Sequence, residues 1–256
     1  MKILVVGNIL KDVYLNLDSR TENFETDRDG VQWLNLGFDN SEHHFFRRNS
    51  CLGGATITLE VLQKMGLSAT ISGNKVDFTE DGVEYAGVAD SYRYILVANE
   101  QISYLTSTGR RTSIFEAPTE AVDYIFVDRS AELDEQVARR IMAYLDISPA
   151  TRLVLHARKT SRGDFEKELI RRSAIVLAER RLDGASAGQV IYLDGFQNER
   201  ENLLTHLSVF SIAAATILGG ILTGKDEEIS IKMAKINVEG SSLDATLSLD
   251  SIMQRV

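Results

Sequence analysis

Cysteine is nearly absent from this chain, since Cys51 is the only one among 256 residues. A single cysteine excludes an intramolecular disulfide and is typical of proteins in a reducing compartment. We expect Cys51 to be a small buried hydrophobic residue rather than a nucleophile. Proline is also scarce, with two residues, while 44% of the chain is hydrophobic. This composition suits a globular protein with a sizeable core.

Concentrated positive charge and long apolar runs are also missing. The formal net charge is −9, and the paired arginines are scattered among acidic residues. Nucleic acid is therefore not an expected partner, because binding phosphates needs a concentrated basic patch. The longest apolar stretch, residues 209–222, falls short of the roughly 18 residues that span a bilayer. The apolar run after Met1 is too short for a signal peptide. We expect a soluble cytoplasmic protein with no membrane partner.

From residue 123 onward, short apolar runs alternate with helical patterns. The run at 174–178 is interpreted as a strand, although it could also continue the preceding helix. This alternation predicts a mainly parallel sheet with helices on both faces. The expected strands are 123–128, 151–157, 174–178 and 189–194, and the expected helices are 133–145, 165–172, about 201–223 and 226–238.

The first half of the chain has a different pattern of apolar and polar residues. A buried strand at 2–7 and a helix at 54–65, ended by Gly66 and followed by a short strand at 67–72, fit the same core. Between them lie segments in which apolar and polar residues alternate, as they do in half-exposed strands. We expect one domain over 1–256, with these strands inserted as a small lid-like sheet at about 12–48 and 85–116. The alternating segments are 12–17, 31–36, 41–49, 93–98, 101–106 and 111–115.

One segment imitates a phosphate-binding loop. Residues 219–226 read GGILTGKD, which matches G-x-x-x-x-G-K-[ST] except that Asp226 replaces Ser or Thr. A genuine loop of this kind follows a strand and opens a helix. Here the glycines follow apolar residues at helical spacing. We therefore predict that Gly219 and Gly220 lie within or at the end of a helix and that Gly224 stands just beyond it.

The histidines give no independent motif. His43 and His44 are adjacent, so on a strand they point to opposite faces, and exposed polar positions explain them better than a metal site. His156 ends an expected strand, where it could be a ligand, but a core or solvated histidine is the favoured interpretation.

The first hundred residues do resemble a known family. The strand Ile3-Leu4-Val5-Val6-Gly7-Asn8 is followed by Asp12, and Leu52-Gly53-Gly54-Ala55 opens a helix that closes at Met65-Gly66. With Gly109-Arg110-Arg111-Thr112, this pattern is similar to that of ribokinase-like (PfkB-type) carbohydrate kinases. The motifs lie within residues 2–115. The resemblance implies an α/β fold with a mainly parallel central sheet, flanking helices and a small β-sheet lid.

The resemblance also implies a substrate site for a sugar or nucleoside. In the family, an aspartate and a glycine pair hold the sugar, roles that would fall here on Asp12, Gly53 and Gly54. A glycine pair has no Cβ to block a ligand that approaches the backbone N–H groups at a helix start. Asn8 is a further candidate, and Thr58 stands where the family has an asparagine.

On the phosphate side the chain departs from the family. The resemblance implies ATP-dependent phosphoryl transfer with Mg-ATP, with no tightly bound cofactor and no assigned metal ligand. The family's Gly-Ala-Gly-Asp falls on Thr205-His206-Leu207-Ser208. Ser208 takes the place of the catalytic aspartate, and a hydroxyl of ordinary pKa is not such a base, although it can cap a helix. The family's Asn-x-x-Glu falls on Ala178 and Arg181, while Asn198–Glu201 comes too late in the chain.

Two functions stay open at this point. The first is a divergent kinase for a carbohydrate or nucleoside, with impaired phosphoryl transfer. The second is a non-catalytic sugar-binding or regulatory pseudokinase. A weaker third possibility is a scaffold. Exposed edges of the lid strands would allow a homodimer.

Overall fold

The computed structural model describes much of the backbone and, over a smaller part of the chain, the side chains. Side chains are described for residues 1–9, 54–72, 115–128, 135–157, 164–179, 181–182, 188–196, 209–241 and 247–256. The backbone is described for residues 1–17, 24–26, 32–34, 46–72, 77–79, 82–84, 91–98, 101–109, 115–128, 135–157, 164–179, 181–182, 188–196, 205–241 and 247–256.

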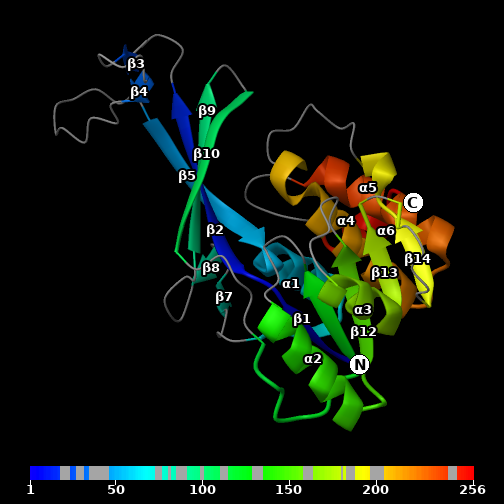
Figure 1. The fold of residues 1–256 in the computed structure, drawn as a ribbon. Helices are drawn as coiled ribbons and strands as arrows, with labels where there is room; N and C mark the ends of the chain where they lie inside the picture. The colour runs from blue at the N-terminus through cyan, green and yellow to red at the C-terminus, as the bar shows by residue number, and fades with distance from the viewer. Residues whose placement is uncertain are drawn as a thin grey trace.

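Six parallel strands form the central sheet (Figure 1), in the order β14-β13-β12-β11-β1-β6. Every neighbouring pair in this sheet is parallel, which confirms the mainly parallel sheet expected from the alternation of strands and helices. Because both faces are covered, the inner strands are continuous runs of Val, Ile, Leu and Phe. The strands are β1 (Lys2–Val6), β6 (Ser68–Ile71), β11 (Tyr124–Asp128), β12 (Arg152–Ala157), β13 (Ser173–Ala178) and β14 (Gln189–Tyr192).

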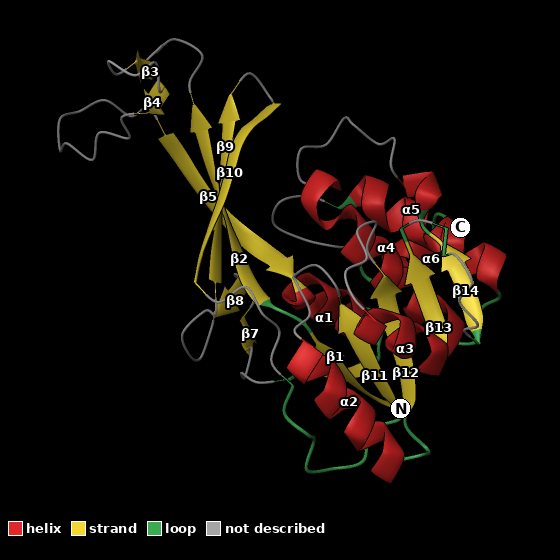
Figure 2. Ribbon diagram, viewed as in Figure 1, coloured by secondary structure: helices red, strands yellow, loops and turns green. Residues whose placement is uncertain are grey.

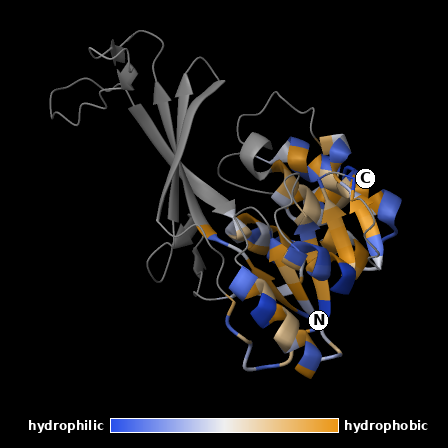
Figure 3. Cartoon of the chain, in the orientation of Figure 1, coloured by the Kyte–Doolittle hydropathy of each residue, from blue (hydrophilic) through white to orange (hydrophobic). Residues whose placement is uncertain are grey.

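Helices cover both faces of this sheet (Figure 2). Successive strand residues point to opposite faces, so two apolar neighbours need cover on both sides. Val5 and Phe126 pack with α1 (Ala55–Lys64), α4 (Thr205–Leu222), α5 (Glu227–Gly240) and α6 (Leu249–Met253). Their chain neighbours Val6 and Val127 pack on the opposite face with α2 (Glu135–Ile147) and α3 (Asp164–Arg172). Figure 3 shows hydrophobic residues concentrated on the strands between these two layers. The fold is thus a sheet between two helical layers.

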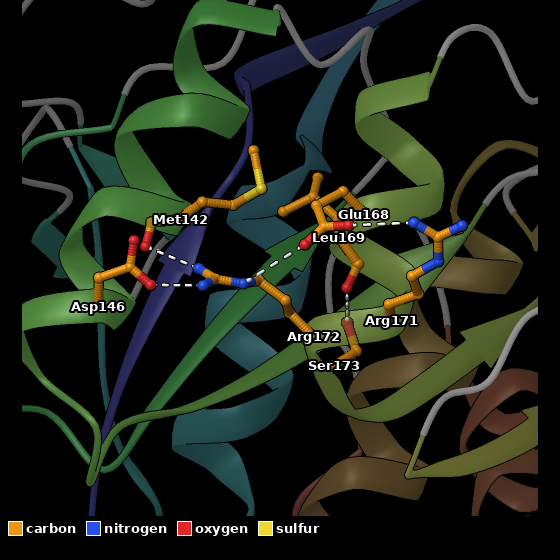
Figure 4. Close-up of polar contacts among 7 residues, drawn as sticks. All are labelled: Met142, Asp146, Glu168, Leu169, Arg171, Arg172 and Ser173. Atoms are coloured by element: carbon orange, nitrogen blue, oxygen red, sulfur yellow. Dashed lines mark hydrogen bonds and ion pairs between the residues drawn. The ribbon is translucent and has the colours of Figure 1, made fainter.

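The α2–α3 layer is joined at its surface by Arg172, the last residue of α3 (Figure 4). Its Nη1 donates to the carbonyl of Met142 at 3.0 Å, its Nη2 pairs with Asp146, and its Nε lies 3.6 Å from Glu168. Beside it, the Ser173 hydroxyl donates to the Leu169 carbonyl at 2.7 Å, where the chain leaves α3 and enters β13. A charged side chain therefore links the end of one helix to the end of the other.

A second, four-stranded sheet has the order β10-β9-β2-β5 and extends away from the central sheet (Figure 2). The β2–β5 and β9–β10 pairs are antiparallel, and β2–β9 is parallel. This is the small sheet that the alternating segments predict. Two antiparallel pairs accompany it, β3 (Phe24–Thr26) with β4 (Gln32–Leu34) and β7 (Asp77–Thr79) with β8 (Gly82–Glu84). Its own strands are β2 (Ile9–Leu17), β5 (Phe46–Gly54), β9 (Ser91–Ala98) and β10 (Gln101–Gly109).

The run at 174–178 is a strand, as the sequence favoured, and not a continuation of α3. Some predicted boundaries are wrong. The strand expected at 189–194 ends at Tyr192, and Asp194–Phe196 forms a 3₁₀ helix, η1. Residues 201–204 of the expected helix and residues 111–114 of an expected strand lie outside the described residues. Phe115 belongs to no strand and packs edge-on against Tyr144, with ring centroids 5.9 Å apart.

The segment that imitates a phosphate-binding loop is a helix end, as predicted. Gly224 has φ +87 and follows α4 in a Schellman motif. The Lys225 N–H donates to the Gly220 carbonyl at 2.9 Å, and the Gly224 N–H donates to the Ile221 carbonyl at 3.0 Å. Asp226 then caps α5 by accepting a 2.8 Å bond from the Ile229 N–H. The backbone of Gly224 and Lys225 and the carboxylate of Asp226 therefore serve the turn between two helices.

The two glycines inside α4 allow close helix packing. A Cβ on Gly219 would collide with the side chain of Met65 at the end of α1, and one on Gly220 would lie 2.5 Å from Ser230 Oγ of α5. Because glycine has no Cβ, both neighbours approach the backbone of α4. In the described part of the chain, no helix has the length and apolar character needed to cross a membrane.

Candidate functional site at the carboxyl edge of the sheet

The strand order reverses between β1 and β11. The chain runs from β1 through α1 to β6 on one side, then returns to the other side of β1 as β11 and continues to β12, β13 and β14. In open α/β sheets, ligands bind outside the carboxyl ends of the strands at such a reversal. The residues at this point are Gly7 and Asn8, which follow β1, and Asp128, which ends β11.

Close backbone packing brings the start of α1 to this point. A Cβ on Gly7 would lie 2.5 Å from the Ala55 Cβ and 3.0 Å from the Asp128 carbonyl oxygen, so only glycine fits there. The Ala55 N–H donates to the Asn8 carbonyl at 3.1 Å. Gly54, which precedes the helix, has φ 58, a conformation that favours glycine. The sequence thus uses two glycines to place a helix start at the strand reversal.

Asp128 is a buried carboxylate at the centre of this region, with 1% of its surface exposed. Its Oδ2 accepts a hydrogen bond from the Thr58 hydroxyl of α1. Its Oδ1 lies 3.5 Å from the donating hydroxyl of Ser211 in α4 and 3.3 Å from His156 Nδ1. Buried carboxylates need such compensation, because the loss of hydration is costly.

His156 lies between two carboxylates. Its Nδ1 faces Asp128, and its Nε2 lies 3.0 Å from Glu179 Oε1, an ion pair in which the N–H is not aimed at the oxygen. Burial alone would lower the pKa of His156, but the contacts with Asp128 and Glu179 raise this pKa to about 9. At neutral pH the ring is therefore an imidazolium, and we call Asp128, His156 and Glu179 the buried ion triad.

The strand register assembles this triad. Asp128 pairs with His156 across β11 and β12, and the Glu179 N–H donates to the Ala157 carbonyl at 2.9 Å just beyond β13. His156 is a core histidine, as the sequence favoured, but its partners were not predicted. The signal was available, since each of three successive apolar runs ends in or beside a titratable residue.

Some of the predicted substrate residues converge at the strand reversal. Asn8, Gly54 and Thr58 lie there, and Asn8 and Thr58 are buried. Gly53 pairs with Leu10 near the end of β5. The structure therefore brings four of the five predicted substrate residues to the junction between the two sheets.

Asp12 lies within β2, in register with Cys51 and Arg93, which agrees with the strand expected at 12–17. The side chain of Asp12 lies outside the described residues. This strand begins only two residues after Gly7, earlier than the sequence predicted.

The predicted phosphate-side residues, Thr205-His206-Leu207-Ser208, form the first turn of α4. Their side chains lie outside those described. Ser208 is the fourth residue of the helix and is not its N-cap, which corrects the sequence expectation. Ser211, three residues further along, contacts Asp128. The beginning of α4 therefore lies at the same carboxyl edge as the beginning of α1.

The positions of the family's Asn-x-x-Glu and the remaining histidines contribute no further residue to the described site. Ala178 ends β13, Arg181 is exposed, and it is the intervening Glu179 that joins the ion triad. His43, His44 and residues 198–201 lie outside the described residues. Among the side chains that are described, no three His, Cys, Asp or Glu residues are arranged to hold a metal ion.

Comparison with known proteins relates this chain to others by fold. No family model and no curated protein matches the sequence. Among solved structures, a ribokinase from Arabidopsis thaliana, complexed with ribose and ATP, matches with a TM-score of 0.65 and 9% identity over 99% of this chain and 97% of that one. A nucleoside kinase from Burkholderia thailandensis, in complex with inosine, matches with a TM-score of 0.64 and 11% identity over 100% of this chain and 95% of that one.

A ribokinase from Cryptococcus neoformans, in complex with ADP, gives a TM-score of 0.63 and 11% identity over 100% of this chain and 99% of that one. The chain therefore has the ribokinase-like α/β fold of carbohydrate and nucleoside kinases, which confirms the fold that the sequence resemblance implied.

Proposed function

We propose that this chain is a homologue of ribokinase-like kinases that binds a sugar or nucleoside and has impaired phosphoryl transfer. The observation that carries the proposal is the convergence of Asn8, Gly54 and the start of α1 at the strand reversal, within a fold shared over the full chain with sugar and nucleoside kinases. A reversal of this kind is where such sheets bind small ligands.

On the substrate side, the backbone supports a polyol ligand. Gly53 and Gly54 have no Cβ to block a hydroxyl-bearing ligand at the start of α1, where the Ala55 N–H itself donates to the Asn8 carbonyl. Asp12 lies on the strand paired with this segment and would accept hydrogen bonds from vicinal hydroxyls. We propose the second sheet as a lid over this ligand.

On the phosphate side, the start of α4 suits an anion, because helix N-termini carry partial positive charge. Mg-ATP, when bound as the resemblance implies, would supply the phosphoryl group. Transfer also needs a group that takes the acceptor's proton. Ser208 is no such base, Asp128 is engaged by Thr58, Ser211 and His156, and Glu179 is paired with an imidazolium. These contacts support impaired catalysis.

The alternative is a sugar-binding or regulatory pseudokinase that has lost transfer altogether. The contacts of Asp128 and Glu179 with His156 favour this alternative, because neither of these two carboxylates is available as the missing base. We further propose that the protein acts in the cytoplasm as one domain, and that a homodimer could form through β10 or β5, the edge strands of the second sheet.

Thermal unfolding with ribose, inosine and Mg-ATP, combined with a phosphorylation assay, tests this function. We expect ribose or inosine to raise the midpoint, and turnover to be absent or very slow. Efficient ATP-dependent phosphorylation of a sugar or nucleoside would contradict the impairment. A shift with ribose or inosine but none with Mg-ATP would select the pseudokinase.

The role of Asp12 is tested in the same assay. We expect Asp12→Ala to abolish the shift that ribose or inosine causes, because the carboxylate would accept their hydroxyl hydrogens. Asn16→Ala, on the same strand but farther from α1, is the matched control and should keep the shift. An unchanged shift in Asp12→Ala would remove Asp12 from the site.

A further inference from the structure

A single buried carboxylate joins the two helices whose beginnings carry the proposed ligand sites. We propose that Asp128 is a positioning residue that fixes the starts of α1 and α4 to one point of the sheet, and thereby couples the polyol side of the site to the phosphate side. The ligand part of this inference rests on the proposed function, whereas the mechanical part does not.

The two helices meet Asp128 from separate directions. Thr58 is the fourth residue of α1 and donates to Oδ2, and Ser211 is the seventh residue of α4 and donates to Oδ1. Each helix thus uses a different oxygen of the same carboxylate. Because a hydrogen bond depends on distance and direction, neither helix start can shift without weakening its own bond to Asp128.

The helices also touch at their far ends. Met65 at the end of α1 packs against the bare backbone of Gly219 near the end of α4. The two helices therefore lie parallel, with a polar link near their beginnings and an apolar contact near their ends. The polar link lies toward Gly54 and residues 205–208, where ligands are proposed to bind, so this link is the one that a ligand would stress.

The Asp128 carboxylate accepts from both hydroxyls, and the imidazole of His156 lies against it. The Asp128 carboxylate from β11 and the Glu179 carboxylate after β13 both face that imidazole, and the hydroxyls of Thr58 and Ser211 face Asp128. Without the imidazolium, two carboxylates would remain in a region that water hardly reaches.

A consequence is reciprocal coupling. A ligand that orders the start of α1 fixes Thr58, and this holds Asp128 in the position that Ser211 also needs. By linkage, a ligand at the start of α4 must strengthen binding at the start of α1 by the same factor.

Hydrogen exchange in the ligand-free protein tests the mechanical link. Thr58→Val keeps the side-chain volume and removes the hydroxyl, whereas Thr58→Ser loses a methyl group and keeps the hydroxyl. We expect Thr58→Val to speed exchange of the α4 amides over 205–211 by about fivefold or more, and Thr58→Ser to have little effect. A role in packing alone predicts the opposite order. Ser211→Ala should likewise speed exchange at the start of α1.

Thr223→Val is the matched control. It removes a hydroxyl that donates to the Gly219 and Gly220 carbonyls at the other end of α4, far along the chain from Ser211. We expect no change at the start of α1 in this variant. The mechanical link is overturned if Thr58→Val changes exchange in α1 alone, or if Thr223→Val and Ser211→Ala act equally on α1.

Ligand titration tests the coupling itself. In the wild type we expect Mg-ADP or Mg-ATP to lower the Kd for ribose or inosine by about fivefold or more. In Thr58→Val the Kd should be nearly the same with and without the nucleotide. In Thr58→Ser the nucleotide should lower the Kd as it does in the wild type. If ribose and inosine both fail to bind, the proposed function fails, and hydrogen exchange still decides the link. If the ligands bind without affecting each other, the function stands and the coupling is overturned.

Discussion

The two helical layers contain polar links of opposite kinds. The α2–α3 layer is joined through Arg172 at the surface, where its partners Asp146 and Glu168 are in contact with solvent. The α1–α4 layer is joined through the buried ion triad, in which the Asp128 and His156 side chains are 0% and 2% exposed. Surface ion pairs contribute little because water competes for both charges, whereas breaking a buried pair leaves a charge without hydration. The comparison predicts that equivalent substitutions have very unequal effects in the two layers.

The largest effect should follow from removing the cation of the buried triad. His156→Leu keeps an apolar volume but leaves Asp128 and Glu179 without their shared partner, so we expect a loss of about 3–5 kcal/mol in the free energy of unfolding. Urea unfolding at pH 7 measures this loss. His156→Gln, which keeps a donor, should lose less. A loss below about 1 kcal/mol in His156→Leu would show that the triad is no more valuable than a surface pair.

The pH dependence of stability should be nearly as large. The pKa of His156 is about 9 in the folded protein, above the ordinary value of 6.5. A raised pKa means that folding takes up protons, so the stabilisation is complete below pH 6.5, declines as pH rises and is lost through pH 9. Each pKa unit corresponds to about 1.4 kcal/mol, which makes the expected loss on the order of 3 kcal/mol.

Urea unfolding from pH 6 to pH 10 measures this dependence. The difference between the wild type and His156→Gln should shrink across the interval, because the variant has no imidazole to titrate. Parallel curves for the two proteins would mean that His156 keeps its ordinary pKa, and that the triad is not held by an imidazolium.

A smaller effect is expected from the close packing that places α1. Gly7→Ala would put a Cβ 2.5 Å from the Ala55 Cβ, and both atoms belong to backbone-anchored groups that cannot rotate away. We expect a loss of about 1–3 kcal/mol in the free energy of unfolding. Gly195→Ala is the control, since a Cβ there meets nothing within 4 Å. Equal losses in the two variants would contradict a tight start of α1.

The sequence predicted those features that depend on local patterns. The end of α4 is such a case, because Gly224 and Asp226 carry the chemistry of a helix stop and a helix cap within a few residues. The parallel sheet was also predictable, since its apolar runs are short and alternate with amphipathic helices. Local composition was enough because these signals lie within a few residues of one another in the chain.

The ion triad was not predictable in the same way. Asp128 and His156 are 28 residues apart, and they meet only because β11 and β12 pair in one particular register. A shift of one residue would turn His156 to the other face of the sheet. The start of β2 was missed for a related reason, since pairing with β5 carries the strand back to Ile9, ahead of Asp12. Contacts between distant strands decide both cases.

The smallest effect should come from the surface link that opens this comparison. Arg172→Ala removes one hydrogen bond to the Met142 carbonyl and ion pairs with Asp146 and Glu168. Several partners around one guanidinium make this more than an isolated pair, so we expect a loss of about 1 kcal/mol, measured by urea unfolding.

Salt should weaken this surface contribution, because ions screen exposed charges but hardly reach buried ones. In 1 M NaCl the difference between the wild type and Arg172→Ala should shrink, whereas the loss in His156→Leu should persist. Arg139→Ala, which removes an exposed pair with Glu135 within α2, should be milder than Arg172→Ala because it joins no second helix. If Arg172→Ala instead cost as much as His156→Leu and resisted salt, burial would not be what distinguishes the two layers.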